Sequence, residues 1–186
     1  MTSVPASLIA NVARGVLQDC VLAAQELPDP PTDAWRRRWI AVIALLRAVG
    51  NVLQNTDRAN GDSALRRAID DGWKIVETTR PPIFWEFIKR ERDGVLKAYE
   101  FTASQSVTLA LRPSPSPIIV RGGGGPRSGS VMQHGPRVQA IYTATMASGA
   151  FKGEKPKDVV QRAITWWTEQ LDWVDAEAVR IRAGVP

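Results

Sequence analysis

Residues that bind metals or act as nucleophiles are almost absent from this sequence. Among 186 residues there is one cysteine, Cys20, and one histidine, His134. A single cysteine cannot form an internal disulfide, and together with a single histidine it cannot complete a usual four-ligand zinc site. No acidic motif indicates a magnesium site. We therefore predict no metal and no cofactor, and we expect any chemistry to be independent of metal ions.

Long apolar runs are also lacking. The best candidate, residues 39–46, is bounded by Arg38 and Arg47, and it is much shorter than the roughly 20 apolar residues that span a bilayer. The first residues do not combine a basic region, an apolar run and a small-residue cleavage site, so no signal peptide is expected. These absences predict a cytoplasmic protein that makes no membrane contact.

Acidic residues are scarce in one part of the chain, although the net charge of the whole is only +5. Residues 101–155 carry six basic residues against Glu154 alone, and residues 32–60 carry five arginines against two aspartates. Residues 156–186, in contrast, carry four basic and five acidic residues. Clustered positive charge attracts polyanions such as nucleic acids. The alternative is that these side chains form an ordinary solvated surface.

Five arginines are candidate binding residues for such a polyanion. Arg36 and Arg37 stand at the beginning of a predicted helix, where the helix dipole disfavours cations and an anionic partner would compensate. The other three candidates lie in the acid-poor segment: Arg121, Arg127 and Arg137.

What the sequence has in quantity is apolar residues at helical spacing. They make up 44% of the chain. Seven of them are tryptophans, and together they provide enough apolar side chains for one hydrophobic core. Spacings of three and four residues predict helices at 4–27, 33–57, 63–79 and 83–101, and a last helix from about residue 157. The second helix should be a central strut about 37 Å long. Its buried seam, the row of apolar residues that faces the other helices, consists of Trp35, Trp39, Val42, Leu46, Val49 and Leu53.

Two other helices have predicted buried stripes. In the first helix the stripe consists of Ile9, Val12, Val16, Cys20, Ala23 and Leu27, so Cys20 is expected to be a small buried hydrophobe. In the helix that follows Pro81-Pro82 the stripe consists of Phe84, Phe87, Ile88, Glu91, Val95, Ala98 and Tyr99. Gly94 lies inside that helix, where it marks a bend or a close helix crossing, or is simply tolerated.

The last helix should have one apolar and one acidic side. The inward stripe consists of Val160, Ala163, Trp167, Leu171, Val174 and Ala178. The outer side is expected to carry Glu169, Asp172, Asp175 and Glu177. For the third helix, Asp62 or Ser63 can serve as the N-cap.

After Phe101 the pattern changes to short alternating segments, which predict strands at 106–112, 118–121 and 138–146. The glycine-rich stretch 122–135 lies between the last two, and it lacks the GK[ST] ending of a phosphate-binding P-loop. His134 in this stretch has no apparent partner residue.

The fold class predicted from these patterns is mainly α (α+β), a four- to five-helix bundle. A small antiparallel hairpin or three-stranded sheet should be inserted before the C-terminal helix. We expect a single domain, in which residues 1–101 form the bundle and residues 102–155 form the hairpin with its glycine-rich loop. Residues 156–183 should form a helix that packs on the bundle.

One short motif carries a resemblance to a known family. Arg92, Lys97 and Tyr99 are spaced as Arg-x4-Lys-x-Tyr, which resembles the Arg-x4-His-x-Tyr signature of the HEPN superfamily. These are helical-bundle proteins that include metal-independent ribonucleases of toxin–antitoxin and phage-defence systems. In that family the arginine and histidine of two subunits are thought to converge on the scissile phosphate. The resemblance covers at most residues 1–101.

The departure from the family pattern is Lys97, which stands where the family has histidine. A histidine titrates near neutrality and can exchange protons with the 2′-hydroxyl, whereas a solvated lysine contributes only positive charge. The alternative reading of Arg92 and Lys97 is that they are surface charges in contact with neighbouring acidic residues.

Three hypotheses follow for the function. The first is a degenerate HEPN-like regulatory protein without catalytic activity, which binds RNA or a protein partner. The second is a metal-independent ribonuclease in which Lys97 stabilises the transition state electrostatically. The third is a structural or adaptor protein, for example of a mobile element, that forms a homodimer through its tryptophan-rich faces.

Overall fold

The spacing of apolar residues between positions 35 and 60 produces one unbroken helical rod. The rod consists of α2 (Trp35–Val52), the π-helical segment η1 (Leu53–Asp57) and the single turn α3 (Arg58–Asn60). All six residues of the predicted seam are buried, which confirms the central strut. Trp35 and Trp39 stack with their ring centroids 5.2 Å apart, so the seam begins with a rigid aromatic pair.

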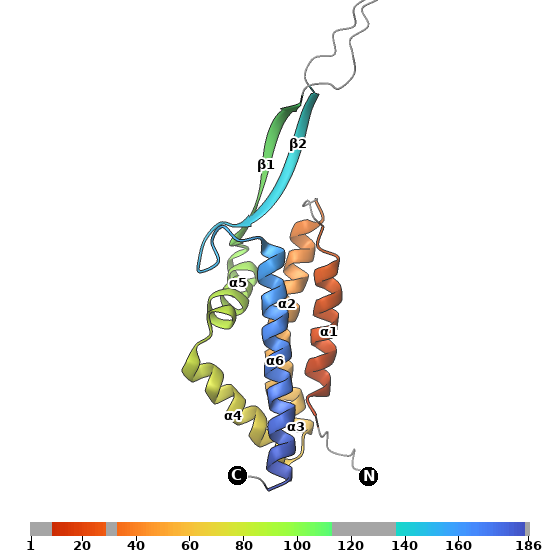
Figure 1. Ribbon diagram of the computed structural model, residues 1–186, viewed down its shortest axis with the longest axis vertical. Coiled ribbons are helices and arrows are strands. Elements are labelled where there is room, and N and C mark those ends of the chain that lie inside the picture. Colours follow the sequence, from red (N-terminus) through yellow and green to blue (C-terminus); the bar gives the residue numbers. More distant parts are fainter. Residues whose placement is uncertain (1–8, 29–32, 113–136, 185–186) are drawn as a thin grey trace, which may run out of the picture.

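The computed structural model describes residues 9–28, 33–112 and 137–184, and the other helices pack around this rod (Figure 1). They are α1 (Asn11–Gln25), α4 (Ser63–Thr79), the broken helix η2–α5–η3 and α6 (Pro156–Arg182). The broken helix consists of η2 (Ile83–Lys89), α5 (Arg90–Asp93) and η3 (Gly94–Ala98). The predicted helical bundle is therefore confirmed. Among the described residues, no helix combines the length and apolar character needed to cross a membrane.

The last helix joins the bundle through one tryptophan. Trp167 of α6 is buried, and its Nε1 donates a hydrogen bond of 2.8 Å to the Leu46 carbonyl of α2. The indole lies against Gly50, where an added Cβ would stand only 2.8 Å from the ring. Gly50 thus permits the close approach of α6 to α2. The rest of the predicted α6 stripe is buried as well: Val160, Ala163, Leu171, Val174 and Ala178.

The first helix is rotated relative to the prediction. Ile9 and Val12, expected in the core, are 39% and 45% exposed, whereas Ala10 and Ala13 are fully buried. The reason lies in Asp57, a buried carboxylate at the end of η1. It accepts hydrogen bonds from the backbone N–H groups of Val12 (3.0 Å) and Ala13 (2.8 Å). A distant side chain therefore caps the N-terminus of α1, and small alanines are needed where it approaches.

A second carboxylate acts on the same helix end. Asp175 of α6 accepts from the Ala10 N–H at 2.9 Å and forms an ion pair with Arg14 at 2.6 Å. Its side chain is only 15% exposed. The expectation that Asp175 belongs to the acidic outer side of α6 is therefore wrong, because it binds α1 instead.

The strands form a two-stranded antiparallel ribbon that projects from one end of the bundle (Figure 1). Strand β1 (Ala103–Arg112) pairs with β2 (Arg137–Met146), with Ala103 opposite Met146 at the base and Arg112 opposite Arg137 at the far end. Ten residues per strand correspond to a ribbon about 33 Å long. The predicted hairpin is confirmed, and the predicted strand at 118–121 lies outside the described residues.

The base of the ribbon is fixed to the bundle, while its apolar face is not covered by described residues. Ala103 and Met146 are buried, and the Gly153 N–H donates to the Met146 carbonyl at 2.7 Å. Further out on the same face, Val107 and Leu109 are 53% and 68% exposed. Two strands alone are marginally stable in water, so we infer that the anchored base holds the ribbon in place.

Glu91 of α5 links the bundle to this base. Its carboxylate is 1% exposed and accepts a hydrogen bond of 2.8 Å from Trp39 Nε1 of α2. It also accepts from the backbone N–H and the hydroxyl of Thr102, the residue before β1. One buried carboxylate therefore satisfies donors from two elements that are distant in sequence.

We predict that Glu91→Ala lowers the free energy of unfolding by about 3 kcal/mol, because it leaves buried donors of Trp39 and Thr102 without an acceptor. Glu100→Ala, which removes an exposed carboxylate of the same segment, should change it by less than about 0.5 kcal/mol. Urea unfolding measures both values. Equal stability of the two variants would show that the Glu91 hydrogen bonds do not hold the ribbon base.

A second prediction concerns Asp62, which accepts from the Leu65 N–H at 2.8 Å as the N-cap of α4 and pairs with Arg182 of α6 at 2.7 Å. The hydrogen bond from Arg182 holds the pKa of Asp62 below its ordinary value. Its contribution to stability is therefore fully present above the ordinary pKa, near 4, and is lost as the pH falls through the lower folded-state pKa.

The variant Asp62→Asn retains the cap, since asparagine also caps helices, but it loses the charge. We expect this substitution to lower Tm at pH 6, and we expect the difference from the natural protein to disappear near pH 2. Thermal unfolding followed by circular dichroism across this pH range is the measurement. A difference in Tm that stays constant with pH would contradict the ion-pair explanation.

Candidate anion-binding cleft beside the ribbon

The segment between α4 and the ribbon has unusual backbone geometry at both ends. Arg80, which ends α4, has φ 45°, and Tyr99, which ends η3, has φ 56°. Residues other than glycine rarely adopt this left-handed conformation. Between them, π-helical η2 and η3 flank the single α turn of α5. Such π-helical segments occur frequently at functional sites, so this segment is the first place to look for one.

Gly94 explains how the segment ends. The Glu100 N–H donates a hydrogen bond of 3.0 Å to the Gly94 carbonyl, so the chain closes on itself after η3. A Cβ at Gly94 would lie 3.2 Å from the Glu100 carbonyl oxygen, which is tighter than an ordinary contact. The close contact at Gly94 is therefore with the backbone that follows η3 in the same segment, and not with a crossing helix.

An open cleft of about 870 Å³ lies along this segment. Its walls come from the end of α4, from η2 and α5, from residues 100–102 before the ribbon, and from Ser148 after it. Pockets of this volume are in the range that accommodates small ligands. The cleft therefore lies at the junction of the bundle and the ribbon.

Trp85 of η2 lines the cleft together with two cations. The Arg80 guanidinium carbon lies 4.7 Å from the centroid of its ring, and the Lys89 ammonium lies 4.3 Å from it. These are cation–π distances. No carboxylate of the described residues forms an ion pair with Arg80 or Lys89. Among the described residues, no acidic side chain therefore competes directly with a ligand for these two cations.

The carboxylates of the cleft are mostly engaged by other cations. Glu86 pairs with Arg90 at 3.4 Å. Asp93 accepts from Arg92 at 2.7 Å and from Lys97 at 3.2 Å. The hydrogen bond from Arg92, followed by that from Lys97, holds the pKa of Asp93 below its ordinary value. Asp93 is thus ionised at neutral pH and shared by two cations.

The residues of the HEPN-like motif are only partly brought together. Arg92 and Lys97 meet at Asp93, as the surface-charge alternative predicted. Tyr99 is 62% exposed and contacts Phe101 edge-on with a centroid distance of 5.1 Å. The prediction that Ala98 and Tyr99 face inward is wrong, because the wider π turn of η3 shifts them out of the 3.6-residue register.

Behind Arg92 lies a further cation, Arg47 of α2. Its guanidinium carbon is 5.6 Å from the centroid of the Phe84 ring, and its Nη1 is buried without a hydrogen-bond acceptor in the described structure. Burial, and after it the positive charge of Arg92, lower the pKa of Arg47 from its ordinary value. Arg47 therefore adds to the positive potential on this side of the bundle.

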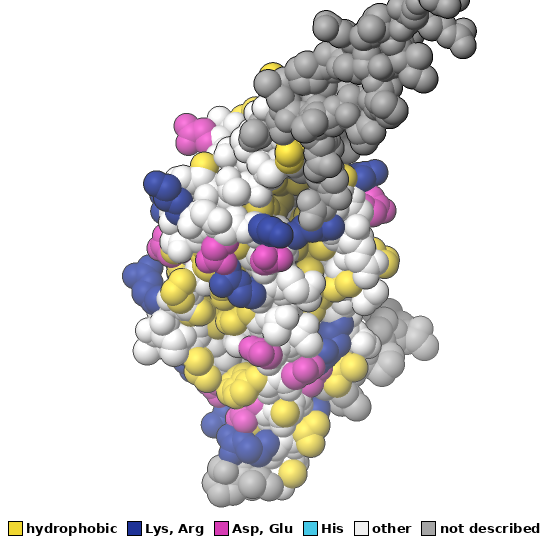
Figure 2. All heavy atoms as spheres, turned by 45° about the horizontal axis from the view of Figure 1, so that its top comes forward, with side chains coloured by type: hydrophobic (Ala, Val, Ile, Leu, Met, Phe, Trp, Pro, Cys, Tyr) yellow, Lys and Arg dark blue, Asp and Glu magenta, His cyan; other side chains and the backbone are white. Residues whose placement is uncertain are grey.

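The five candidate binding arginines are not gathered into one site. The Arg36 guanidinium carbon lies 5.3 Å from the centroid of Phe101, a residue that lines the cleft, while Arg37 is exposed. Arg137 occupies the far end of β2, and Arg121 and Arg127 lie outside the described residues. Figure 2 shows basic and acidic side chains interspersed on the visible surface of the bundle, with hydrophobic ones between them.

Sequence reasoning missed the role of Arg80, Trp85 and Lys89. The signal that could have indicated it was a tryptophan between cations, shortly after a proline pair. Their juxtaposition depends on the left-handed turn at Arg80, which the sequence does not specify on its own.

Comparisons with protein-family models, with curated proteins and with solved structures find no match to this chain. The cleft must therefore be interpreted from its own geometry and charge.

Other chemistry finds little support among the described residues. Within 9–28, 33–112 and 137–184, no three histidine, cysteine or acidic side chains are grouped so that they could hold a metal ion. Cys20 is fully buried, which confirms that prediction, and burial raises its thiol pKa to about 12. His134 lies outside the described residues.

We predict that Cys20 does not react with a thiol reagent at pH 8 in the folded protein, because a buried thiol with this pKa is almost never a thiolate. The reaction should go to completion in denaturant, which serves as the control. The absorbance change of an aromatic disulfide reagent measures both. Rapid stoichiometric labelling of the native protein would contradict the burial.

Proposed function

We propose that this protein is a non-enzymatic regulatory protein that binds nucleic acid, in the first place RNA, and is similar to a degenerate HEPN domain. The observation that carries the proposal is the distribution of charge. Residues 101–153 contain five basic residues and no acidic one, whereas the rest of the chain contains 19 of each. The entire net charge of +5 therefore belongs to the ribbon, its connection and the turn that follows.

The shape of the ribbon supports the same proposal. A two-stranded antiparallel ribbon is one of the elements that fit the major groove of B-DNA, so its shape supports nucleic-acid binding in general and not RNA in particular. One face of this ribbon carries small hydroxyl side chains, and Ser106 Oγ and Thr143 Oγ1 lie 2.6 Å apart. Such side chains can bond phosphate and sugar oxygens. Two of the five basic residues, Arg112 and Arg137, stand opposite each other at the far end of the described strands, about 33 Å from the base.

The absence of catalysis in this proposal rests on Lys97. Its side chain is 67% exposed and bonded to Asp93, so it supplies charge where the HEPN pattern has a proton-exchanging histidine. The ribonuclease alternative would need another general acid or base, and we do not propose it. Membership in a toxin–antitoxin, phage-defence or mobile-element system is the setting that the resemblance suggests, and association with a protein partner or a second copy stays a prediction.

The test compares two variants with the same change in net charge. Arg121, Arg127 and Arg137 are replaced by alanine in the first, and Arg58, Arg66 and Arg67 of the bundle in the control. Fluorescence anisotropy with a labelled single-stranded RNA over a range of salt concentrations gives both affinity and salt slope. We expect the ribbon variant to bind at least about tenfold more weakly and its log–log salt slope to fall by about 2.

The control variant should bind within about twofold of the natural protein and retain the slope. Equal losses in both variants would mean that net charge, and not the ribbon, attracts the RNA. Absence of RNA binding by the natural protein at low salt would refute the proposed function.

A further inference from the structure

We propose that the cleft beside the ribbon is a specific binding site for a phosphate monoester, with Arg80 and Lys89 as its anion-binding groups. The ligand chemistry is that of a nucleoside monophosphate or of the terminal phosphate of an RNA. This inference rests on the geometry of the cleft and does not depend on RNA binding by the ribbon.

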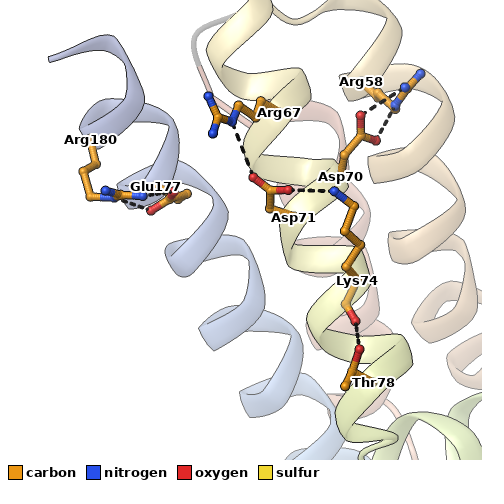
Figure 3. A network of polar contacts seen from close by, with 8 residues as sticks. All are labelled: Arg58, Arg67, Asp70, Asp71, Lys74, Thr78, Glu177 and Arg180. Carbon is orange, nitrogen blue, oxygen red and sulfur yellow. Dashed lines mark hydrogen bonds and ion pairs between the residues drawn. The ribbon is translucent and has the colours of Figure 1, made fainter. Parts of the chain in front are cut away.

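The first support is that these two cations form no ion pair among the described residues, in contrast to the cations on the face formed by α4 and α6. On the face formed by α4 and α6, Arg67 and Lys74 share Asp71, at 3.7 and 3.0 Å (Figure 3). In the same view Arg58 is bonded to Asp70, and Arg180 to Glu177. Arg80 and Lys89 contact a tryptophan ring instead, in the cleft of about 870 Å³.

The second support is the charge of the cleft as a whole. Three carboxylates line it: Glu86, Asp93 and Glu100. Three cations line it as well: Arg80, Lys89 and Arg90. Glu86 and Asp93 are bonded to Arg90, Arg92 and Lys97. Of the three lining carboxylates, Glu100 alone forms no ion pair among the described residues, so a phosphate monoester, at about −1.5 to −2 near neutral pH, would add charge that Arg80 and Lys89 lack.

The third support is the backbone of Arg80. The left-handed position that ends a helix is usually occupied by glycine, because other residues are strained there by about 1 kcal/mol. Here the position carries an arginine whose guanidinium extends along Trp85. An arginine offers a planar fork of donors that matches phosphate oxygens, and the neighbouring lysine adds a point charge. The Arg80 N–H caps α4 by donating to the Val76 carbonyl at 3.1 Å, and the same left-handed turn places the guanidinium beside Trp85 in the cleft.

The nonpolar part of the ligand is indicated by the aromatic lining. Trp85 and Phe101 are both partly exposed and both line the cleft. Aromatic side chains provide stacking surfaces for nucleobases. We therefore expect a nucleoside monophosphate to bind more tightly than inorganic phosphate, and the nucleoside alone to bind most weakly.

The experiment is isothermal titration calorimetry of the full chain at low salt with adenosine 5′-monophosphate, adenosine and inorganic phosphate. The test variant is Arg80→Gly with Lys89→Ala, in which glycine relieves the strained backbone. The control is Arg67→Ala with Lys74→Ala, which removes the same two charges from α4 outside the cleft. We expect the natural protein and the control to bind the monophosphate in the submillimolar range, and the test variant at least about tenfold more weakly.

Lys89→Gln alone serves as a second variant should the double variant not fold, and it should weaken monophosphate binding by about threefold or more. Three results would overturn the proposal: no binding of the monophosphate at about 1 mM, equal binding of adenosine and the monophosphate, or equal losses in test and control variants.

Two further titrations are informative. The first distinguishes the two possible sources of the phosphate, and the second distinguishes this proposal from RNA binding by the ribbon. An oligoribonucleotide with a 5′-phosphate should bind more tightly than the same oligonucleotide with a 5′-hydroxyl if an RNA end occupies the cleft. Equal affinities, with monophosphate binding intact, would assign the cleft to a free nucleotide. The variant lacking Arg121, Arg127 and Arg137 should bind the monophosphate normally, and a parallel loss there would refute the independence of the cleft.

Discussion

The arrangement of the bundle and the ribbon where they meet depends on one buried carboxylate. Glu91 has its charge inside the protein, which is costly unless hydrogen-bond donors surround it. Trp39 of α2 and Thr102 before β1 provide those donors. Because both must reach the same carboxylate, α5 is held against the rod and the ribbon begins at a fixed place. The cleft beside α5 follows from that constraint.

The same principle operates at the start of α1, where Asp57 and Asp175 accept hydrogen bonds from backbone amides. In both places a remote acidic side chain completes the hydrogen bonds of a helix or strand end. Acidic residues are therefore used for internal bonding in the bundle, and basic residues remain in excess in the ribbon segment. This division gives a neutral scaffold that carries a cationic arm.

Much of the fold could be predicted from the sequence because the seams of α2 and α6 are regular and rich in tryptophan. The Asp62 cap and the alternation of β2 were likewise local signals. The rotation of α1 could not be predicted, since Asp57 reaches it from 44 residues away. The prediction that Tyr99 faces inward was wrong because a π turn breaks the helical period. The cleft was missed because the left-handed turn at Arg80 alone brings its side chain to Trp85.

The central proposal is that anions bind at the ribbon end of the bundle. The most direct measurement is a titration of ¹⁵N-labelled protein with a short 5′-phosphorylated oligoribonucleotide, followed by amide chemical shifts. We predict that the amide chemical shifts of residues 80–102 and of the two strands change. The shifts of α1 and of the C-terminal half of α6 should not change. Changes centred on α1 or on the acidic end of α6, or none at low salt, would contradict the claim.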